Sequence, residues 1–504
     1  MEKIAIIDLG SNTARLLIVD VTDNGHFYIV DQLKEAPRLG EGMERDGFLK
    51  PDRIHETINT LKMFRKLCDV NGIERITAVA TAAVRRAKNQ RSFLDEVSAT
   101  CGIKLRVLSA EEEALLVYRG IINTMDIPKG IILEIGGGST KIVYYNRRNL
   151  LNYETLPFGA ITLTELFAND GLTPVEQAEK IEQFITEQLK NIEWLSTVDP
   201  EAQLICSGGS FRNLCRMTKI MKKYPLKTIH NYVINDNDFN HVYDLIKGLD
   251  LDRKKKIKGL SSGRADILPA ALACTSAFKK YMNLENITIS GNGLRTGLLF
   301  NYVVPTTVDK PISDVLTYSL NSLVEFYGCN TKHVEQVVSL SIQLFKQLRV
   351  LHKFPRQYLK ILKVASYLYD AGKSTGFYNF EKHSSYIILN ANIYGISHRD
   401  LVMASFVAAC TGIDDVNLAD WARYSELLND EDLDAVRKLG IILKIASCLD
   451  RSLSSVIKGI NCDILGDSVI MKTEVEGDAA LEISSALQVS SDFRKNFKKN
   501  LEIL

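Results

Sequence analysis

An acidic residue stands beside a glycine-rich turn at two places in this sequence. In segment 131–145, Glu134 lies in an apolar run, and Gly136, Gly137 and Gly138 follow it. A lone carboxylate in a buried strand is costly unless it is paired or bound, so Glu134 needs a role. Consecutive glycines let the backbone approach a ligand closely and point N–H groups at an anion. The pattern is typical of a metal–phosphate site, although a plain hairpin turn with an odd acid would also produce it.

The same layout occurs near the N-terminus. Asp8 matches Glu134, and a basic residue follows seven positions after each acid, Arg15 in the first copy and Lys141 in the second. Both copies then continue into a second β-favouring run. A repeat this far apart in the chain predicts two similar lobes, each presenting an acid and a tight loop to a shared cleft.

Hydrophobic patterning places these motifs on an α/β region that a helical region follows. Strand–glycine turns recur at 204–210 and 288–293 and alternate with helices, which indicates α/β lobes ending near residue 304. Pro305 and Pro311 bracket a linker, the chain beyond it is almost wholly helical, and the tail becomes strand-like. The expected domains are two α/β lobes at 1–122 and 123–304, a helical domain at 312–454 and a tail at 455–504.

Composition excludes several classes of protein. The chain has 504 residues, enough for three or four domains, with 46% apolar and 24% charged residues. A net charge of +1 gives no general attraction to nucleic acid or membrane, so any anion site must be local. Nine cysteines without a C-x-x-C spacing favour a reducing compartment over a disulfide or zinc scaffold. We therefore expect a cytoplasmic protein with neither nucleic acid nor membrane as its partner.

Glu113 differs from the acids beside it. Ser109 and Glu112 have the spacing of a helix capping box, which gives Glu112 a structural role. Glu113 instead shares a helix face with Leu116 and Val117. Apolar surroundings disfavour the charged form of a carboxyl group, so Glu113 needs a role other than capping. A second helix-capping acid is the alternative interpretation.

Taken in order, these motifs resemble the exopolyphosphatase/guanosine pentaphosphate phosphohydrolase (Ppx/GppA) family of the actin–hexokinase–Hsp70 fold group. The likeness covers nearly the whole chain and includes segments 8–12, 38–40, 80–89, 109–114, 135–140, 156–160, 207–212, 264–269 and 290–295. It implies two actin-like (ribonuclease H-like) lobes with a cleft between them, an all-α HD-like domain and a small C-terminal α+β tail. It also implies an enzyme that cuts the terminal phosphoanhydride of polyphosphate or guanosine pentaphosphate with water and Mg²⁺ or Mn²⁺, and we expect a homodimer.

The resemblance assigns roles to individual residues. Glu113 is the expected general base, and Asp8 and Glu134 are the expected metal ligands, partly through water. Arg85 is an expected phosphate-binding residue, and a surface salt bridge is the alternative interpretation of it. Arg38 is a weaker candidate for phosphate binding. The expected phosphate-binding residues are Gly10, Ser11, Asn12, Arg85, Gly136, Gly137, Gly138, Ser139, Lys141, Gly208 and Gly209.

Three positions depart from the family pattern. The first acid of the loop is Glu134 rather than the usual aspartate. The family loop usually ends in a glutamate that helps to bind the metal, and Lys141 reverses that charge. Either its ammonium contacts phosphate and replaces part of the metal's role, or metal-dependent catalysis is impaired. In the helical region, Tyr369 stands where an HD-like site has a histidine beside Asp370. Even with His333 and His383 present, we expect no independent metal site there.

Several functions agree with these residues. The first is an exopolyphosphatase, and a guanosine pentaphosphate 5′-phosphohydrolase is the alternative within the same class. A catalytically weakened regulator that binds guanosine polyphosphates or nucleotides is the alternative of another class, which Lys141 favours. A sugar or acetate kinase of the same fold group is disfavoured, because Glu113 and the segment around Arg85 match the phosphohydrolases.

Overall fold

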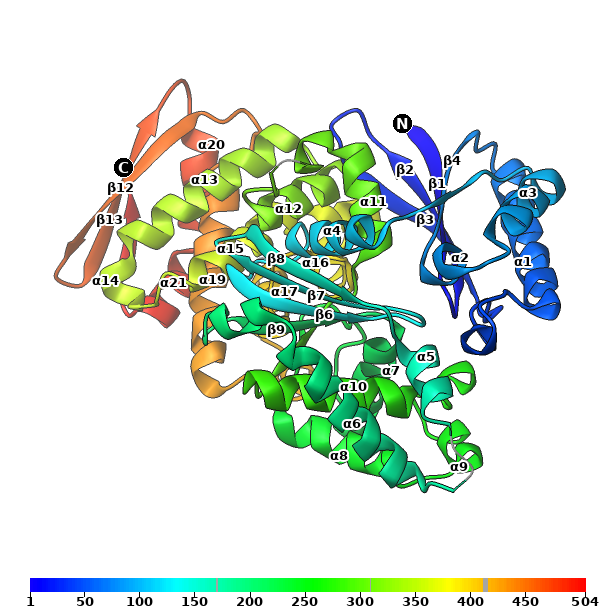
Figure 1. The fold of residues 1–504 in the computed structure, drawn as a ribbon. Coiled ribbons are helices and arrows are strands. Elements are labelled where there is room, and N and C mark those ends of the chain that lie inside the picture. Colours follow the sequence, from blue (N-terminus) through cyan, green and yellow to red (C-terminus); the bar gives the residue numbers. More distant parts are fainter. Residues whose placement is uncertain (169–170, 309, 411–415) are drawn as a thin grey trace. The chain divides into compact units, whose positions relative to one another are not determined.

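The computed structural model describes residues 1–168, 171–308, 310–410 and 416–504 (Figure 1). The chain divides into two compact units, Met1–Tyr224 with Ile229–Ser313, and Pro225–Thr228 with Asp314–Leu504. The predicted four-domain division stays a prediction. Its ranges 123–304 and 312–454 and the linker 305–311 include residues 169–170, 309 and 411–415, which lie outside the described residues.

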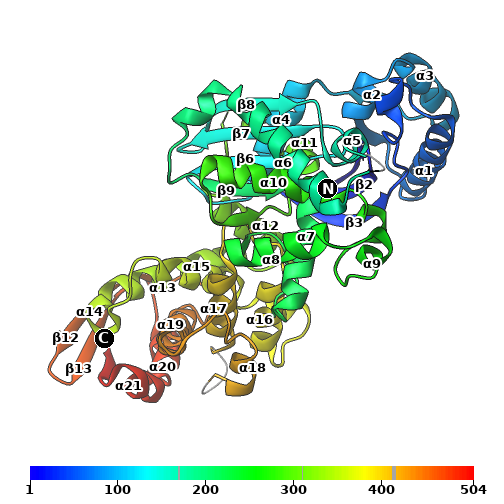
Figure 2. The same ribbon diagram turned by 60° about the horizontal axis from the view of Figure 1, so that its bottom comes forward.

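The first lobe of the first unit contains a five-stranded sheet in the order β3-β2-β1-β4-β5. Strands β1, β2 and β3 are antiparallel neighbours, whereas β4 runs parallel to β1 and β5 parallel to β4. Helices α1 and α3 lie beside this sheet in both views (Figures 1 and 2). The elements are β1 (Glu2–Leu9), β2 (Ala14–Val21), β3 (Phe27–Glu35), α1 (Pro51–Val70), β4 (Arg75–Ala80), α2 (Ala82–Arg86), α3 (Gln90–Cys101) and β5 (Leu105–Val107).

The second lobe repeats this arrangement in a six-stranded sheet of order β10-β11-β9-β6-β7-β8. Strands β6, β7 and β8 are antiparallel, and β9 and β11 continue the sheet in parallel from β6. The duplicated hairpin of the sequence is therefore a duplicated sheet, and the prediction of two α/β lobes is confirmed. The elements are β6 (Lys129–Ile135), β7 (Thr140–Asn146), β8 (Asn149–Leu156), α5 (Ala160–Leu166), α6 (Pro174–Lys190), β9 (Gln203–Ser207), α7 (Gly209–Met221), β10 (Tyr232–Ile234), α8 (Asp236–Lys247), α9 (Leu251–Lys255), α10 (Leu268–Met282) and β11 (Ile287–Ile289).

The central strands β1 and β6 are buried on both faces, because they are apolar at consecutive positions rather than at alternate ones. In β6, Ile131 and Leu133 belong to the core that α6 and α10 cover, while Ile132 belongs to the core on the opposite face. In β1, Ile7 and Ile6 divide between two cores in the same way. Successive side chains of a strand point to opposite faces, so an acid in such a strand has no solvent face to turn to. That constraint directs Asp8 and Glu134 to the strand ends and the loops beyond them.

Two helices meet where the lobes join, α4 (Ala110–Ile122) and α11 (Leu294–Val303). A Cβ atom added at Gly297 would overlap the carbonyl oxygen of Leu116, and one added at Gly120 would overlap that of Gly293. The helix backbones are therefore in direct contact at glycine. Because α4 begins just before Glu113 and α11 just before Arg295, this contact fixes the distance between two parts of the site described below.

The second unit is helical and ends in a small three-stranded sheet of order β12-β13-β14. A strand was predicted near residues 468–474, and β13 occupies that position. In the described parts of the chain, none of the helices has the length and apolarity that a bilayer crossing requires. The elements are α12 (Val315–Phe326), α13 (Thr331–Gln347), α14 (Arg349–His352), α15 (Tyr358–Leu368), α16 (Phe380–Asn390), α17 (His398–Ala409), α18 (Leu418–Ala422), α19 (Asp430–Cys448), β12 (Ile457–Leu465), β13 (Ser468–Val475), α20 (Ala480–Leu487), α21 (Ser490–Phe497) and β14 (Asn500–Ile503).

A buried polar cluster lies inside this helical unit. His333 Nδ1 lies 2.6 Å from a carboxylate oxygen of Asp450, and its Nε2 is hydrogen-bonded to the hydroxyl of Tyr369. Both ring nitrogens of His333 thus have a hydrogen-bond partner. Asp370 forms an ion pair with Lys373 at 3.2 Å. Each polar group in the cluster serves another side chain.

Replacing Gly297 by Ala should destabilise the first unit. Overpacking a core costs about 1–3 kcal/mol, more than the gain of about 1 kcal/mol that Ala brings to a helix interior. The readout is the melting temperature of the purified chain. Gly263→Ala is the control, because no atom lies within 4 Å of the Cβ it would add. Equal melting temperatures in the two variants would contradict direct contact between the backbones.

Replacing Tyr369 by Phe should lower the stability of the helical unit by about 1–3 kcal/mol, because His333 Nε2 would be left buried without a partner. Chemical denaturation followed by circular dichroism measures the loss. Tyr378→Phe is the control, since that ring is 85% exposed. A variant as stable as the control would show that the phenol does not hold this histidine.

Candidate active site

One pocket in the first unit gathers the candidate residues from both lobes. It lies between the loop after β1, the loop after β6, the start of α4 and the glycine turns before α7 and α11. Of the residues expected to act, Arg85 and the weaker candidate Arg38 do not line it. The lining residues from that set are Asp8, Gly10, Ser11, Asn12, Glu113, Glu134, Gly136, Gly137, Gly138, Ser139, Lys141, Gly208 and Gly209.

The seven-residue spacing of acid and base is the register of each hairpin. Asp8 at the end of β1 lies directly opposite Arg15 on β2, and Glu134 lies directly opposite Lys141 on β7. Side chains that face each other across an antiparallel pair are close enough to interact. The two copies therefore place an acid and a base at the same point of each lobe.

The first glycine of each loop closes a turn. The N–H of Gly10 donates to the carbonyl of Thr13 at 3.0 Å, and the N–H of Gly136 donates to the carbonyl of Ser139 at 2.9 Å. Both N–H groups are thus already used within the loop, and phosphate binding by Gly10 and Gly136 stays a prediction.

The other loop glycines let the two lobes approach each other. A Cβ atom on Gly137 would lie 2.9 Å from the Cβ of Ser11, and one on Gly138 would lie 2.9 Å from the Ser11 hydroxyl. Gly208 has a φ of 114°, a backbone conformation that disfavours other residues.

Beside these glycines, Asn12 is 3% exposed, and neither polar atom of its side chain has a partner within the described chain. A buried amide without partners in a pocket is a group arranged for a ligand.

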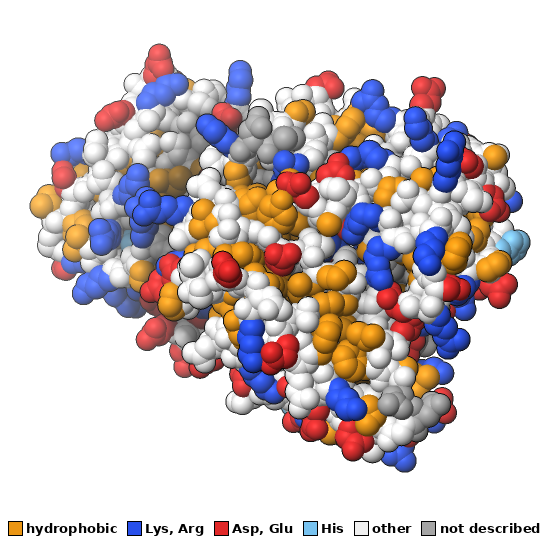
Figure 3. All heavy atoms as spheres, viewed as in Figure 1, with side chains coloured by type: hydrophobic (Ala, Val, Ile, Leu, Met, Phe, Trp, Pro, Cys, Tyr) orange, Lys and Arg blue, Asp and Glu red, His pale blue; other side chains and the backbone are white. Residues whose placement is uncertain are grey.

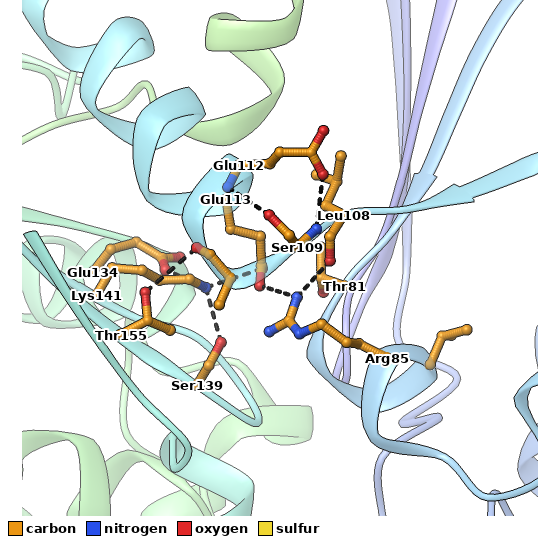
Figure 4. Close-up of polar contacts among 12 residues, drawn as sticks. Thr81, Arg85, Leu108, Ser109, Glu112, Glu113, Glu134, Ser139, Lys141 and Thr155 are labelled. Atoms are coloured by element: carbon orange, nitrogen blue, oxygen red, sulfur yellow. Dashed lines mark hydrogen bonds and ion pairs between the residues drawn. The ribbon is translucent and has the colours of Figure 1, made fainter.

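Glu113 is buried at 1% exposure, but its carboxylate is not in apolar surroundings (Figure 4). Arg85 Nη1 lies 2.7 Å from one carboxylate oxygen, and Lys141 Nζ lies 3.1 Å from the other. The expected apolar environment is thus wrong at the functional end of the side chain, because residues distant in sequence supply two cations. Ser109 and Glu112 form the capping box, which leaves Glu113 free of that role.

Arg85 holds this carboxylate in place. Its Nη1 also donates to the carbonyl of Leu108 at 2.7 Å, and the side chain is 23% exposed. It is neither a plain surface salt bridge nor a lining residue of the pocket. Arg38 is also engaged elsewhere, with Asp266 at 2.5 Å and Glu41 at 3.2 Å.

Lys141 lies at the centre of the polar network. Its Nζ is 3.1 Å from Glu113, 3.1 Å from Glu134 and 2.9 Å from the hydroxyl of Ser139. Burial by itself lowers the pKa of this ammonium, but the carboxylates of Glu113 and Glu134 outweigh burial and raise the pKa above its ordinary value. Lys141 is therefore a permanent positive charge in the pocket.

Four arginines in the pocket were not among the predicted site residues. Burial, and then repulsion from Arg15, lower the pKa values of Arg264 and Arg295 to about 10. The same two causes lower the pKa of Arg212 well below its ordinary value. Cations that disfavour one another in this way are stabilised by an anion. The sequence held a signal for Arg212 and Arg295, because each follows a strand–glycine turn within a few residues.

The positive charge is local to this pocket. Its lining includes five cations, Arg15, Lys141, Arg212, Arg264 and Arg295, against three carboxylates, Asp8, Glu113 and Glu134. On the face shown in Figure 3, acidic and basic side chains are interspersed, in agreement with the net charge of +1. The predicted local anion site thus has a physical basis.

The expected divalent cation does not fit this donor set. One or two carboxylates together with substrate phosphates commonly hold Mg²⁺, and Asp8 and Glu134 line one pocket. However, Glu134 already contacts the ammonium of Lys141, and burial raises the pKa of Asp8 although Arg295 and Arg15 lower it. Among the described residues, no three His, Cys, Asp or Glu side chains are grouped so as to hold one ion. Binding of Mg²⁺ or Mn²⁺ by Asp8 and Glu134 stays a prediction.

Comparison with known proteins matches this chain to a protein family. The model of the Ppx/GppA phosphatase family matches residues 17–304, and that of Ppx/GppA phosphatase domain III matches residues 315–487. A guanosine-5′-triphosphate,3′-diphosphate pyrophosphatase of Pseudoalteromonas translucida (strain TAC 125) is 25% identical over 79% of this chain and 78% of its own length.

Solved structures of similar proteins agree with this result. An exopolyphosphatase from Cytophaga hutchinsonii ATCC 33406 is 25% identical with a TM-score of 0.56, and covers 60% of this chain and 98% of its own. A Ppx/GppA family member from Aquifex aeolicus is 27% identical with a TM-score of 0.51 at the same coverage. The chain therefore belongs to the Ppx/GppA phosphatase family and is a phosphoanhydride hydrolase.

Proposed function

We propose that this enzyme releases terminal orthophosphate from inorganic polyphosphate. The observation that carries the proposal is the composition of the pocket, with five cations, glycine loops and, among its described lining residues, no aromatic side chain. Polyphosphate consists only of anionic phosphoryl groups, which positive charge and N–H donors can bind completely. A guanine base gains much of its binding from stacking on a ring, which these residues do not offer.

The pocket residues have different roles in the proposed phosphoanhydride hydrolysis. The reaction needs charge neutralisation at the transferred phosphoryl group, in-line positioning, and a base that orients the water. Arg15, Arg212, Arg264 and Arg295 supply the positive charge. The amides of Gly137 and Gly138, with Ser11, Asn12 and Ser139, would position the terminal phosphates, and Gly208 and Gly209 line the same pocket.

Glu113 is the proposed general base. It is the lining carboxylate whose two oxygens are each held by a different cation, which fixes their direction in the pocket. A base in a fixed position contributes through orientation as well as through proton transfer. Arg85 acts through Glu113 in this proposal and is a positioning residue.

A guanosine pentaphosphate 5′-phosphohydrolase is the second candidate. The curated relative from Pseudoalteromonas translucida bears the name of that activity, while the Cytophaga hutchinsonii structure bears the name exopolyphosphatase. A regulator that binds such nucleotides with little hydrolysis is the third candidate, and the charge reversal at Lys141 is what favours it.

Phosphate release from the two substrates separates these candidates. The purified full chain should release orthophosphate from polyphosphate with a higher kcat/KM than from guanosine pentaphosphate, because the pocket offers charge but no ring for the base. Assays run with and without Mg²⁺ measure both rates. Release from guanosine pentaphosphate alone would favour the second candidate, and release from neither substrate would favour the regulator.

Replacing Glu113 by Gln should lower kcat by about 10²–10⁴-fold, the usual contribution of a general base. Glu111→Gln is the matched control, because Glu111 lies two residues earlier on the same helix, is exposed and does not line the pocket. Steady-state phosphate release on polyphosphate is the measurement. Full activity of Glu113→Gln would remove this residue from the role of base.

A further inference from the structure

The oxygens around Lys141 use all the hydrogen-bonding capacity of its ammonium group. An ammonium has three donors and no acceptor, and Lys141 Nζ has three oxygen neighbours, on Glu113, Glu134 and Ser139. Two of these neighbours are carboxylates from different lobes. A cation between two carboxylates is the arrangement that a metal ion would otherwise provide.

Lys141 cannot easily move away from this position. The hairpin register holds it opposite Glu134, and the residue is 3% exposed. Water therefore cannot replace its partners unless the strand end opens. Any divalent cation that Glu134 bound would lie next to this buried positive charge, where the low dielectric makes repulsion strong.

The network around Lys141 is neutral without a metal ion. The cations Arg85 and Lys141 balance the carboxylates Glu113 and Glu134, and each contact is 3.1 Å or shorter. In the other hairpin, Arg15 faces Asp8 in the same register. Of the two acids that would hold the divalent cation, Glu134 thus already has a basic partner, and Asp8 has a base opposite it across the hairpin.

We propose that the ammonium of Lys141 takes the place of a divalent cation, so that this site hydrolyses phosphoanhydrides without a metal ion held by Asp8 and Glu134. The inference rests on the proposed hydrolase function and assigns its electrostatics. The four pocket arginines neutralise the terminal phosphoryl group, while Lys141 balances the carboxylates of Glu113 and Glu134 beside it. The water oxygen forms the new P–O bond, and the bridging P–O bond breaks with its electrons left on the shortened chain. The proton of the water passes to Glu113 and then to solvent.

Metal binding tests this inference independently of activity. The chelator-treated full chain is titrated with Mn²⁺, and free Mn²⁺ is measured by electron paramagnetic resonance. The wild type should bind no equivalent, whereas Lys141→Glu, which removes the ammonium and adds an acid, should bind one. That equivalent should be lost in the double variant Lys141→Glu, Glu134→Gln. One equivalent bound by the wild type and lost in Glu134→Gln would overturn the inference.

Lys129→Met is the matched control for removal of the charge. Lys129 also bridges two carboxylates, Asp199 at 2.8 Å and Glu201 at 2.6 Å, but it lies at the other end of β6 and away from the pocket. Lys141→Met should lower phosphate release by about 10²–10³-fold, the size of effect expected when one preorganised electrostatic group is removed from an active site, whereas Lys129→Met should leave release unchanged. Equal rates in the two variants would contradict a role for this ammonium in hydrolysis.

Phosphate release in the presence of EDTA is the second readout. The wild type should keep its rate when Mg²⁺ is removed, and Lys141→Glu should depend on Mg²⁺. Wild-type release that stops in EDTA and returns with Mg²⁺ would overturn the inference. If no variant releases phosphate under any condition, the proposed function fails, while the Mn²⁺ titration still decides whether Lys141 excludes the metal. Circular dichroism checks the fold of Lys141→Glu, and Lys141→Met provides a second variant that adds no buried acid.

Discussion

A buried chain of ion pairs, Arg85–Glu113–Lys141–Glu134, is the interaction on which the rest of the site depends. Its first two members come from the first lobe and its last two from the second. Removing one partner from such a chain costs about 3–5 kcal/mol, because the remaining charge is left buried and unpaired. The chain therefore holds the candidate base in one orientation and makes the two lobes dependent on each other at this point.

Glycines allow the close backbone contacts that this chain of ion pairs requires. The backbones of α4 and α11 are in contact at Gly120 and Gly297, and the loop at Gly137 and Gly138 packs directly on Ser11. Side chains at these positions would separate the lobes. Ion pairs near 3 Å tolerate little separation, since their attraction and hydrogen-bond geometry weaken quickly with distance. Close packing of the backbone and short ion pairs are thus two consequences of the same glycine pattern.

Charge is the main feature that the pocket offers to an anion. Burial, and then repulsion from Arg15, lower the pKa values of Arg212, Arg264 and Arg295. A polyanionic substrate would relieve that repulsion as it binds. In the absence of an aromatic ring among the described lining residues, recognition would depend on charge and on the positions of N–H donors. This arrangement suits a substrate whose repeating unit is a phosphoryl group.

The sequence by itself determined the elements and the duplicated layout. Local rules sufficed for the capping box at Ser109 and for the two α/β lobes, because spacing and strand pattern act within a few residues. The match of Asp8 to Glu134 also predicted which residues would line one pocket.

Only the tertiary structure decided which groups touch. It gave Glu113 two cationic partners instead of apolar surroundings, used the amides of Gly10 and Gly136 inside their own turns, and assembled the arginine cluster. These features depend on contacts between residues far apart in the chain, and periodicity along a sequence does not encode such contacts. The charge at position 141 was readable in the sequence, but its place between two carboxylates was not.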